Sequence, residues 1–379
     1  MKKDLLFLSA LFWFSTQISA QGVTLPPSGD NQKCSVTQHI GSIVTVTVNY
    51  SSPDVTGPDG SDRTGKIWGT SVAHYGMNDQ GFGTSKAAPW RAGANECTTI
   101  TFSHDVLVEG KPISAGTYGL FLMLQESGPW TWIFSKNSTA WGSFFYNEKD
   151  DVLRVDVQPA DHPRTEWLTY TFTDRKPAAA TLELQWELKS IPMHITVPNV
   201  NDLYITQLDK EFESSTGFTA ANFTAAANFL LQENYNLPKA LEYVNMGMDY
   251  PFFGRTDFAS LTTKAQILLQ MGDTDEAMLN IEKAMQMPGA DASQIHMLGR
   301  SLMGLGKKEE AFKIFSLNYD KNKGVWPTNI GMARGLSSLG RYDDALKYAT
   351  AALAQAPDQA NKENVAKMIE KLKLGQDVN

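Results

Sequence analysis

The run Trp90–Glu96, which reads WRAGANE, places an aromatic ring, a guanidinium, an amide and a carboxylate within seven residues. If Gly93 lets the backbone turn here, Arg91 and Glu96 face one pocket. The guanidinium would then hold an anionic group bidentately, Asn95 would orient that group, and Glu96 would serve as an acceptor or a base. The alternative is an Arg91–Glu96 salt bridge that only fastens a loop.

The surrounding residues 51–103 are rich in glycine and polar side chains, and they supply further candidates for a site. Trp68 and Trp90 offer stacking faces for a sugar ring or another planar ligand, so a small molecule or a glycan is the predicted ligand. His74, followed by Tyr75, is the candidate for proton transfer or metal binding, with a purely structural histidine as the alternative. The predicted ligand-binding residues are Trp68, His74, Tyr75, Trp90, Arg91, Asn95 and Glu96.

Familiar cofactor and metal motifs are missing from the sequence. No histidine pair has the HxH or HExxH spacing expected for zinc, and the DGSD run at 59–62 lacks the remaining ligands of a calcium loop. No GxSxG elbow, Walker loop or GxGxxG fingerprint occurs. We therefore predict no cofactor and no metal.

The first twenty residues have the pattern of an export signal. Two lysines precede an apolar run over residues 5–14, and Ala20 is a small residue just before Gln21. This pattern predicts a secretory signal peptide over 1–20 that is cleaved after Ala20. A membrane anchor needs about 20 apolar residues, twice the length of this run. We expect an exported protein, periplasmic or extracellular, with no membrane span in the mature chain.

Export changes what is expected of the only two cysteines, Cys34 and Cys97. Outside the cytosol two thiols tend to pair, and closing a loop of this length stabilises a fold by roughly 4 kcal/mol in the chain-entropy model. The prediction is a Cys34–Cys97 disulfide, and the alternative is two separate buried thiols.

Composition limits the class of protein. At 379 residues the chain is long enough for two or three domains, and its 42% hydrophobic content excludes a disordered chain. A net charge of −8 leaves no basic stripe for phosphate contacts, so nucleic acid is not an expected partner.

The candidate site must be positioned by strands, because apolar residues alternate with polar ones from about Val36 to Val197. Examples of such runs are 44–50, 118–124, 168–172, 182–188 and 193–197. Alternation of this kind is typical of antiparallel sheets with one packed face. We predict an antiparallel β-sandwich domain over 30–197, followed by a polar linker over 198–217.

The second half of the chain repeats with a period of 34 residues. The repeat-signature residues are Gly272, Ala277, Gly306, Ala311, Gly340 and Ala345. This period predicts a tetratricopeptide-like α-helical solenoid over 218–375, with a capping helix at its end. The glycine would end the first helix of each pair in a left-handed conformation, and the alanine would lie where the two helices touch.

The runs SPDVTG, RTGKIWG, AHYGMN, WRAGANE, TTITFS, GTYGLF and WTWIFSK together resemble a bacterial secreted domain family that has no assigned function. The resemblance covers about residues 30–197 and is most specific in WRAGANE followed by TTITFS. It implies a signal peptide and a site around Trp90, Arg91, Gly93, Asn95 and Glu96, but no catalytic role. Cys34 and Cys97 depart from that family's pattern, which fits an added disulfide.

These observations favour an exported, non-catalytic binding or scaffold protein. The repeats are predicted to bind an unknown protein or peptide in their groove, and the β-domain is predicted to bind a ligand or partner. The alternative is a secreted hydrolase that uses Glu96 as acid or base, with His74, Arg91 and Asn95 nearby.

Overall fold

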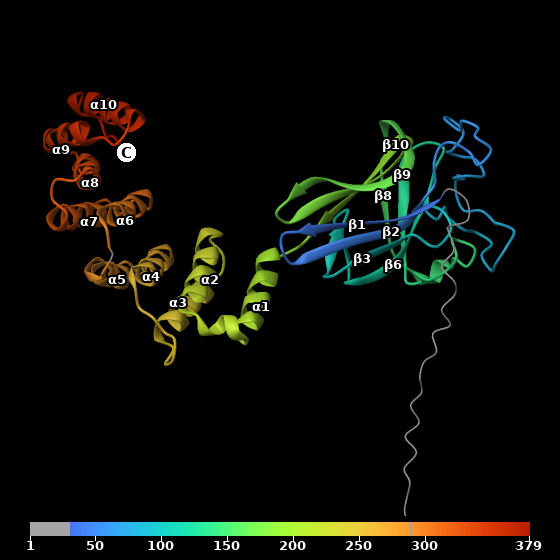
Figure 1. The fold of residues 1–379 in the computed structure, drawn as a ribbon, viewed down its shortest axis with the longest axis horizontal. Coiled ribbons are helices and arrows are strands. Elements are labelled where there is room, and N and C mark those ends of the chain that lie inside the picture. The colour runs from blue at the N-terminus through green and yellow to red at the C-terminus, as the bar shows by residue number, and fades with distance from the viewer. Residues whose placement is uncertain (1–30, 289) are drawn as a thin grey trace, which may run out of the picture. The chain divides into compact units, whose positions relative to one another are not determined.

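The computed structural model describes residues 31–288 and 290–379, and the chain divides into two compact units, Met1–Val200 and Asn201–Asn379 (Figure 1). Within the described residues the first unit is built from strands and the second from helices. The predicted signal peptide lies outside the described residues. No helix in the described ranges has the length and apolarity needed to cross a membrane.

The β-domain contains two antiparallel sheets, as the sequence predicts. The larger sheet has the order β1-β2-β3-β6-β7-β8, and the smaller has the order β5-β4-β10-β9. The strands of the larger sheet are β1 (Gln32–Ile40), β2 (Val44–Ser52), β3 (Thr99–Phe102), β6 (Gly116–Met123), β7 (Trp130–Ser135) and β8 (Asp151–Val157). Those of the smaller are β4 (Val106–Val108), β5 (Lys111–Ile113), β9 (Ala160–Lys176) and β10 (Ala179–Thr196).

The two sheets pack through large side chains that lie between them. Trp132 of β7 is fully buried and donates from Nε1 to the Pro192 carbonyl of β10 at 3.2 Å. Tyr50 of β2 contacts Tyr170 of β9 edge to face, with ring centroids 4.8 Å apart. Along β2 each of the three valines, Val44, Val46 and Val48, is fully buried while the threonines between them are not, so the period of two marks the packed face.

A long connection, residues 53–98, joins β2 to β3 and contains the WRAGANE run. It is held to the sheets by isolated bridges, which are Asp54 with Trp167, Tyr75 with Leu124 and Trp90 with Leu122. Several of its apolar side chains, including Ile67 and Ala88, are fully buried. The connection is therefore a packed part of the domain.

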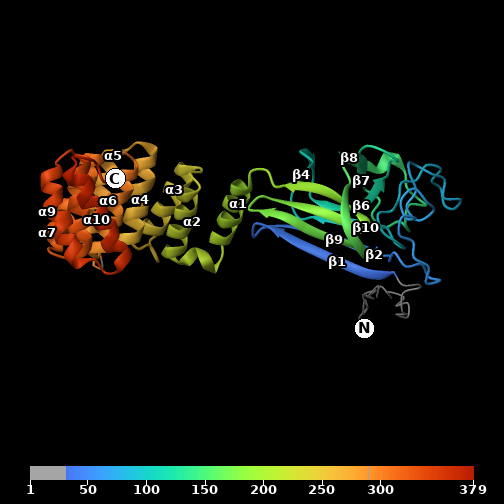
Figure 2. The same cartoon turned by 90° about the horizontal axis from the view of Figure 1, so that it is seen from above.

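The second unit is a stack of helices that pack against one another in pairs (Figure 2). Its helices are α1 (Val200–Phe212), α2 (Ala220–Gln232), α3 (Leu237–Asp249), α4 (Phe258–Met271), α5 (Thr274–Gln286), α6 (Ala292–Gly304), α7 (Lys308–Lys321), α8 (Trp326–Ser338), α9 (Tyr342–Gln355) and α10 (Gln359–Lys373). Gly272, Gly306 and Gly340 are left-handed, with φ of 90°, 75° and 74°. Ala277, Ala311 and Ala345 are fully buried.

The segment predicted as a linker, 198–217, is different in the structure. Helix α1 occupies most of it, and a short 3₁₀ helix follows at Ser215–Phe218. Ile205, Leu208 and Phe212 form a narrow apolar stripe against the first helices of the array, and Phe212 stacks on Phe223 with ring centroids 4.1 Å apart. None of the α1 residues is fully buried, because the stripe is narrow. The segment therefore has too few apolar residues for its sequence to show a helical period.

Candidate functional site

The WRAGANE run turns at residues other than the predicted glycine. Ala92 and Asn95 have left-handed backbones, with φ of 50° and 56°, whereas Gly93 does not. Gly93 is required for a different reason, because a Cβ there would lie 2.6 Å from the Thr98 hydroxyl oxygen. The glycine therefore permits close packing, and Ala92 and Asn95 make the turns.

Arg91 and Glu96 do not meet, so neither the shared pocket nor the salt bridge predicted from the sequence is present. Arg91 donates from Nη1 to the Asn95 carbonyl at 2.8 Å, and its guanidinium lies 5.0 Å from the centre of the Phe144 ring. Glu96 pairs instead with Lys33 at 2.7 Å and accepts a hydrogen bond from Ser51 at 3.1 Å. The hydrogen bond from Lys33 lowers the pKa of Glu96, so this carboxyl stays ionised.

Arg91 and Glu96 line separate cavities of the β-domain. The first, of about 300 Å³, is lined by Trp90, Arg91 and Asn95, together with Asn31, Pro53, Asp54, Pro58, Arg63, Val72, Gly93, Ala94 and Trp186. We call it the Arg91 pocket. Glu96 lines the second, of about 400 Å³, with Cys34, Tyr50, Cys97 and their neighbours. The structure thus brings together three of the predicted site residues, Trp90, Arg91 and Asn95.

One wall of the Arg91 pocket is a pair of stacked indoles. Trp90 and Trp186 are nearly parallel, at 9°, with ring centroids 6.0 Å apart. Trp186 is fully buried, and its Nε1 has no hydrogen-bond partner among the described residues. The sequence does not mark Trp186 as a site residue, because it lies on β10, far along the chain from WRAGANE, and its alternating pattern is that of a core residue.

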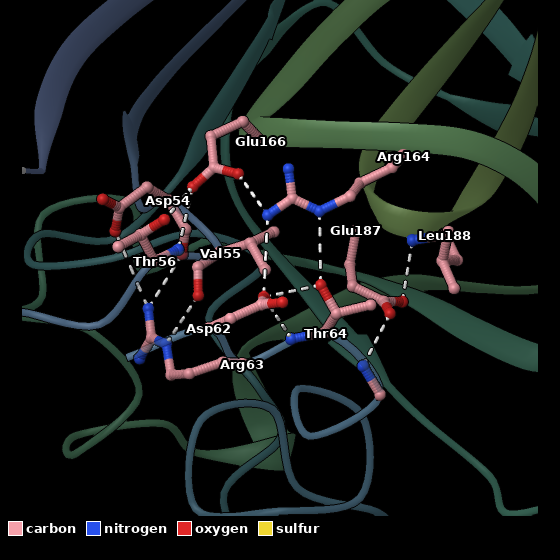
Figure 3. A network of polar contacts seen from close by, with 11 residues as sticks. Asp54, Val55, Thr56, Asp62, Arg63, Thr64, Arg164, Glu166, Glu187 and Leu188 are labelled. Atoms are coloured by element: carbon pink, nitrogen blue, oxygen red, sulfur yellow. Dashed lines mark hydrogen bonds and ion pairs between the residues drawn. The ribbon is translucent and has the colours of Figure 1, made fainter. Parts of the chain in front are cut away.

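The lining of the pocket also includes Arg63 and Asp54, which belong to a network that fastens the connection to β9 (Figure 3). Arg63 donates from Nη2 to the Asp54 carbonyl at 2.8 Å and from Nε to the Val55 carbonyl at 3.1 Å. Glu166 of β9 accepts from the Thr56 amide at 2.8 Å and pairs with Arg164 at 2.6 Å. These contacts fix the backbone that carries the polar edge of the pocket.

Trp68 has a structural role. Its Nε1 donates to the Glu187 carboxylate at 3.1 Å, and its ring packs against Trp90, Trp130 and Trp186. Glu187 is only 2% exposed and also accepts from the Gly65 and Leu188 amides, at 2.8 and 2.7 Å (Figure 3). It lies at an irregularity in the β9–β10 register, which turns its carboxylate toward the connection.

His74 and Tyr75 do not line the Arg91 pocket. The Nε2 atom of His74 lies 2.8 Å from the Gln80 amide nitrogen, and partial burial lowers the pKa of this imidazole. The Tyr75 ring fills the space above Gly69, where a Cβ would overlap it. In the parts of the chain that the structure describes, no group of three or more His, Cys, Asp or Glu side chains is arranged to hold a metal ion.

The predicted disulfide is absent, because Cys34 and Cys97 are both free. Cys34 lies on β1 opposite Tyr50 and is half-buried. Cys97 is buried before β3, and burial raises the pKa of its thiol to about 12. Both side chains line the same cavity. The sequence showed two cysteines near strand ends, but only the strand register sets whether their sulfurs can bond.

The helical unit has a second candidate site, a cleft of about 520 Å³ between α6, α8 and α10. Its lining residues are His296, Arg300, Trp326, Ile330, Arg334, Asn361, Asn364, Val365, Lys367, Met368, Lys371 and Val378. We call it the basic cleft, since these residues include four Arg and Lys side chains and no carboxylate. The 34-residue repeat predicts a groove along the array, but nothing in the sequence singles out these side chains.

Three polar atoms around the basic cleft are buried and have no hydrogen-bond partner among the described residues, namely His296 Nδ1, Trp326 Nε1 and Arg334 Nε. Burial and the nearby Arg300 lower the pKa of Arg334 to about 10. Burial, Arg334 and Arg300 together lower the pKa of His296 to about 4. The cleft is therefore an electropositive site whose donors are not fully satisfied.

The chain's own residues 377–379 lie at one end of this cleft. Asp377 accepts a hydrogen bond from the Ser337 hydroxyl at 2.8 Å, and Val378 is buried in the cleft lining. The Asn379 amide donates to the Arg334 carbonyl at 3.1 Å. An acidic side chain followed by an apolar one thus fits against α8.

The fold and the two sites define a β-domain joined to a helical repeat array. Residues 31–195 match the protein family described as "Protein of unknown function (DUF2911)", and residues 258–291 match the tetratricopeptide repeat. The resemblance to a family without an assigned function is thus confirmed for the β-domain, and the repeats are confirmed for the helical unit. No curated protein matches the chain.

Among solved structures, the chain is similar to YrrB, described as a tetratricopeptide-repeat protein with an unusual peptide-binding site, at 19% identity and a TM-score of 0.30. That similarity covers 45% of this chain and 86% of YrrB. It is also similar to PcrH from Pseudomonas aeruginosa, at 22% identity and a TM-score of 0.26, over 31% of this chain and 91% of PcrH.

Proposed function

We propose that this protein is an exported, non-catalytic binding protein whose repeats hold an extended acidic segment of a partner protein in the basic cleft. The tetratricopeptide repeats imply a protein or peptide partner. The observation that carries the finer proposal is that four cationic side chains and three unpartnered buried polar atoms surround one cleft without a lining carboxylate.

Charge and shape support an acidic peptide in particular. Carboxylates bind Arg and Lys through charge-assisted hydrogen bonds, which are stronger than neutral ones and would supply the missing acceptors. The apolar part of the lining, which includes Ile330, Val365 and Met368, suits alternate apolar side chains. The contacts of Asp377 and Val378 are an example of that alternation within the chain itself.

The alternative function, a secreted hydrolase, receives little support from the site geometry. A general acid needs a carboxyl with a raised pKa close to the reacting group. The pKa of Glu96 is lowered by Lys33, and Arg91 and Asn95 line a different cavity. A binding protein requires no such carboxyl.

Peptide binding by the full chain tests the proposal. The probe is a labelled peptide of about ten residues in which Asp and Val alternate, and its binding is followed by fluorescence anisotropy. Charge reversals at two exposed cleft residues, Arg300→Glu and Lys367→Glu, are each expected to weaken binding by about tenfold or more, and added salt should weaken it further. Lys362→Glu, on the same helix as Lys367 but outside the cleft lining, is the matched control and should bind normally.

The same peptide with Lys in place of Asp should not bind. Equal binding of the Lys peptide, or equal loss of affinity in Lys362→Glu, would show that the cleft does not select an acidic partner. Export is tested separately by fractionating the host cell and sequencing the amino terminus of the protein. We expect a mature chain that begins at Gln21 outside the cytosol, and a full-length cytosolic chain would contradict this.

A further inference from the structure

The guanidinium of Arg91 lacks a counter-ion. It donates one hydrogen bond, to the Asn95 carbonyl, and lies against the face of Phe144. It forms no ion pair with any residue in the described ranges. Burial lowers the pKa of this guanidinium. A cation taken partly out of water costs free energy unless an anion meets it, so this side chain is arranged for a partner that the protein does not itself provide.

A second, independent observation comes from Trp186. This side chain is fully buried, yet it lines the Arg91 pocket and has an unpartnered Nε1 donor. Buried donors are nearly always satisfied in folded proteins. Arg91, whose guanidinium has a carbonyl acceptor but no anion, and Trp186, whose indole N–H has no acceptor among the described residues, therefore line one cavity. An anionic oxygen would serve both groups.

The remaining charges of the pocket limit the ligand's charge. Arg63 and Asp54 lie 3.7 Å apart and largely neutralise one another, so Arg91 supplies the one unmatched positive charge of the lining. A monoanion balances this charge, whereas a dianionic phosphate would leave one negative charge in the pocket without a matching cation. Asn31 and Asn95 add amide groups at the edge, linked by a hydrogen bond of 3.4 Å.

We propose that the Arg91 pocket binds a small organic monoanion, with its carboxylate on the Arg91 guanidinium and its flat apolar part against Trp90 and Trp186. The volume of about 300 Å³ is at the lower end of the range for small-molecule sites, which fits a single-ring acid. This site is distinct from the basic cleft, so the two proposals can be tested independently of each other.

Calorimetric titration of the full chain tests the site. The probe is phenylacetate, with phenylacetamide as its uncharged counterpart and inorganic phosphate as the dianionic comparison. We expect phenylacetate to bind at least about tenfold more tightly than either. Equal binding of the amide, tighter binding of phosphate, or no binding of phenylacetate at millimolar concentration would overturn the proposal.

Three variants locate the binding on the protein. Arg91→Met removes the charge and should abolish the preference for the acid over the amide. Ala94→Leu fills the pocket from its exposed side without removing a hydrogen bond, so it keeps the proposal testable if Arg91→Met does not fold. Arg175→Met, at an exposed arginine of the same domain outside the pocket, is the control and should bind normally.

Unchanged phenylacetate affinity in Ala94→Leu would place the ligand elsewhere and overturn the assignment. The cleft variant Arg300→Glu should leave phenylacetate binding intact while it weakens peptide binding. Failure of one site is thereby distinguished from failure of the other.

Discussion

The Arg91 pocket and the basic cleft have similar chemistry, but the chain builds them in different ways. Each combines arginine side chains with an indole nitrogen that has no hydrogen-bond partner among the described residues, in Trp186 for the pocket and Trp326 for the cleft. Side chains spaced along regular helices line the cleft. The pocket instead depends on two left-handed residues and on a connection held by a buried carboxylate. A regular scaffold makes a site tolerant of local change, whereas an irregular one depends on a few contacts.

The largest effect is expected from a substitution that disrupts the connection on which the Arg91 pocket depends. Glu187→Ala removes the acceptor of the Gly65 amide, the Leu188 amide and the Trp68 indole, and leaves these donors without a partner. We expect the free energy of unfolding of the β-domain to fall by about 3 kcal/mol or more. Denaturant unfolding followed by tryptophan fluorescence measures the loss.

The control for this experiment is Glu126→Ala, at an exposed position of the same domain, where the change should stay within about 0.5 kcal/mol. A loss in Glu187→Ala no larger than in this control would show that the connection does not depend on the buried carboxylate.

The next largest effect is expected from lowering the pH, which should reduce the stability of the helical unit through His296 in the basic cleft. The folded pKa of His296, about 4, lies below its usual value near 6.5, so the unfolded chain binds the proton more readily. Stability is then fully present above about pH 6.5 and falls by about 1 kcal/mol per pH unit between pH 6.5 and 4. The melting temperature of the repeats, compared with that of His296→Gln, measures this contribution. Equal pH profiles for the two proteins would contradict it.

A smaller effect tests how the repeats tolerate local change. At Gly340 the backbone is left-handed and a Cβ would meet no atom within 4 Å, so Gly340→Ala carries only a conformational cost of about 1 kcal/mol. Gly304→Ala is the matched control, because this glycine, the last residue of α6, has equally open space and no left-handed backbone, and alanine favours a helix by about 0.5–1 kcal/mol. Thermal unfolding should lower the melting temperature of the first variant and raise that of the second, and the same sign for both would contradict the assigned roles.

The smallest expected effect comes from the cysteines. Since Cys34 and Cys97 are free, a reducing agent has no disulfide to break. The melting temperature of the β-domain should be the same with and without dithiothreitol, and mass spectrometry after alkylation under denaturing conditions should count two free thiols. A drop in melting temperature on reduction would show that Cys34 and Cys97 do form a disulfide in the protein.

Local sequence determined the elements of this protein well. The alternation along β2 predicts its buried valines, and the 34-residue spacing of Gly306 and Gly340 predicts the helix ends. Helix α1 was missed because its apolar stripe is narrow and sits in a polar segment. Periodicity reports a packed face only when enough of that face is apolar.

The sites depended on contacts that the sequence does not display. WRAGANE identified Trp90, Arg91 and Asn95 as pocket residues, but it also grouped Glu96 with Arg91, which the folded chain separates. Trp186 and Glu187 come from β10, nearly a hundred residues further along the chain. Residue type and spacing determine local conformation because these depend on near neighbours. Which charges lack partners depends on distant segments that meet only when the sheets and the long connection pack together.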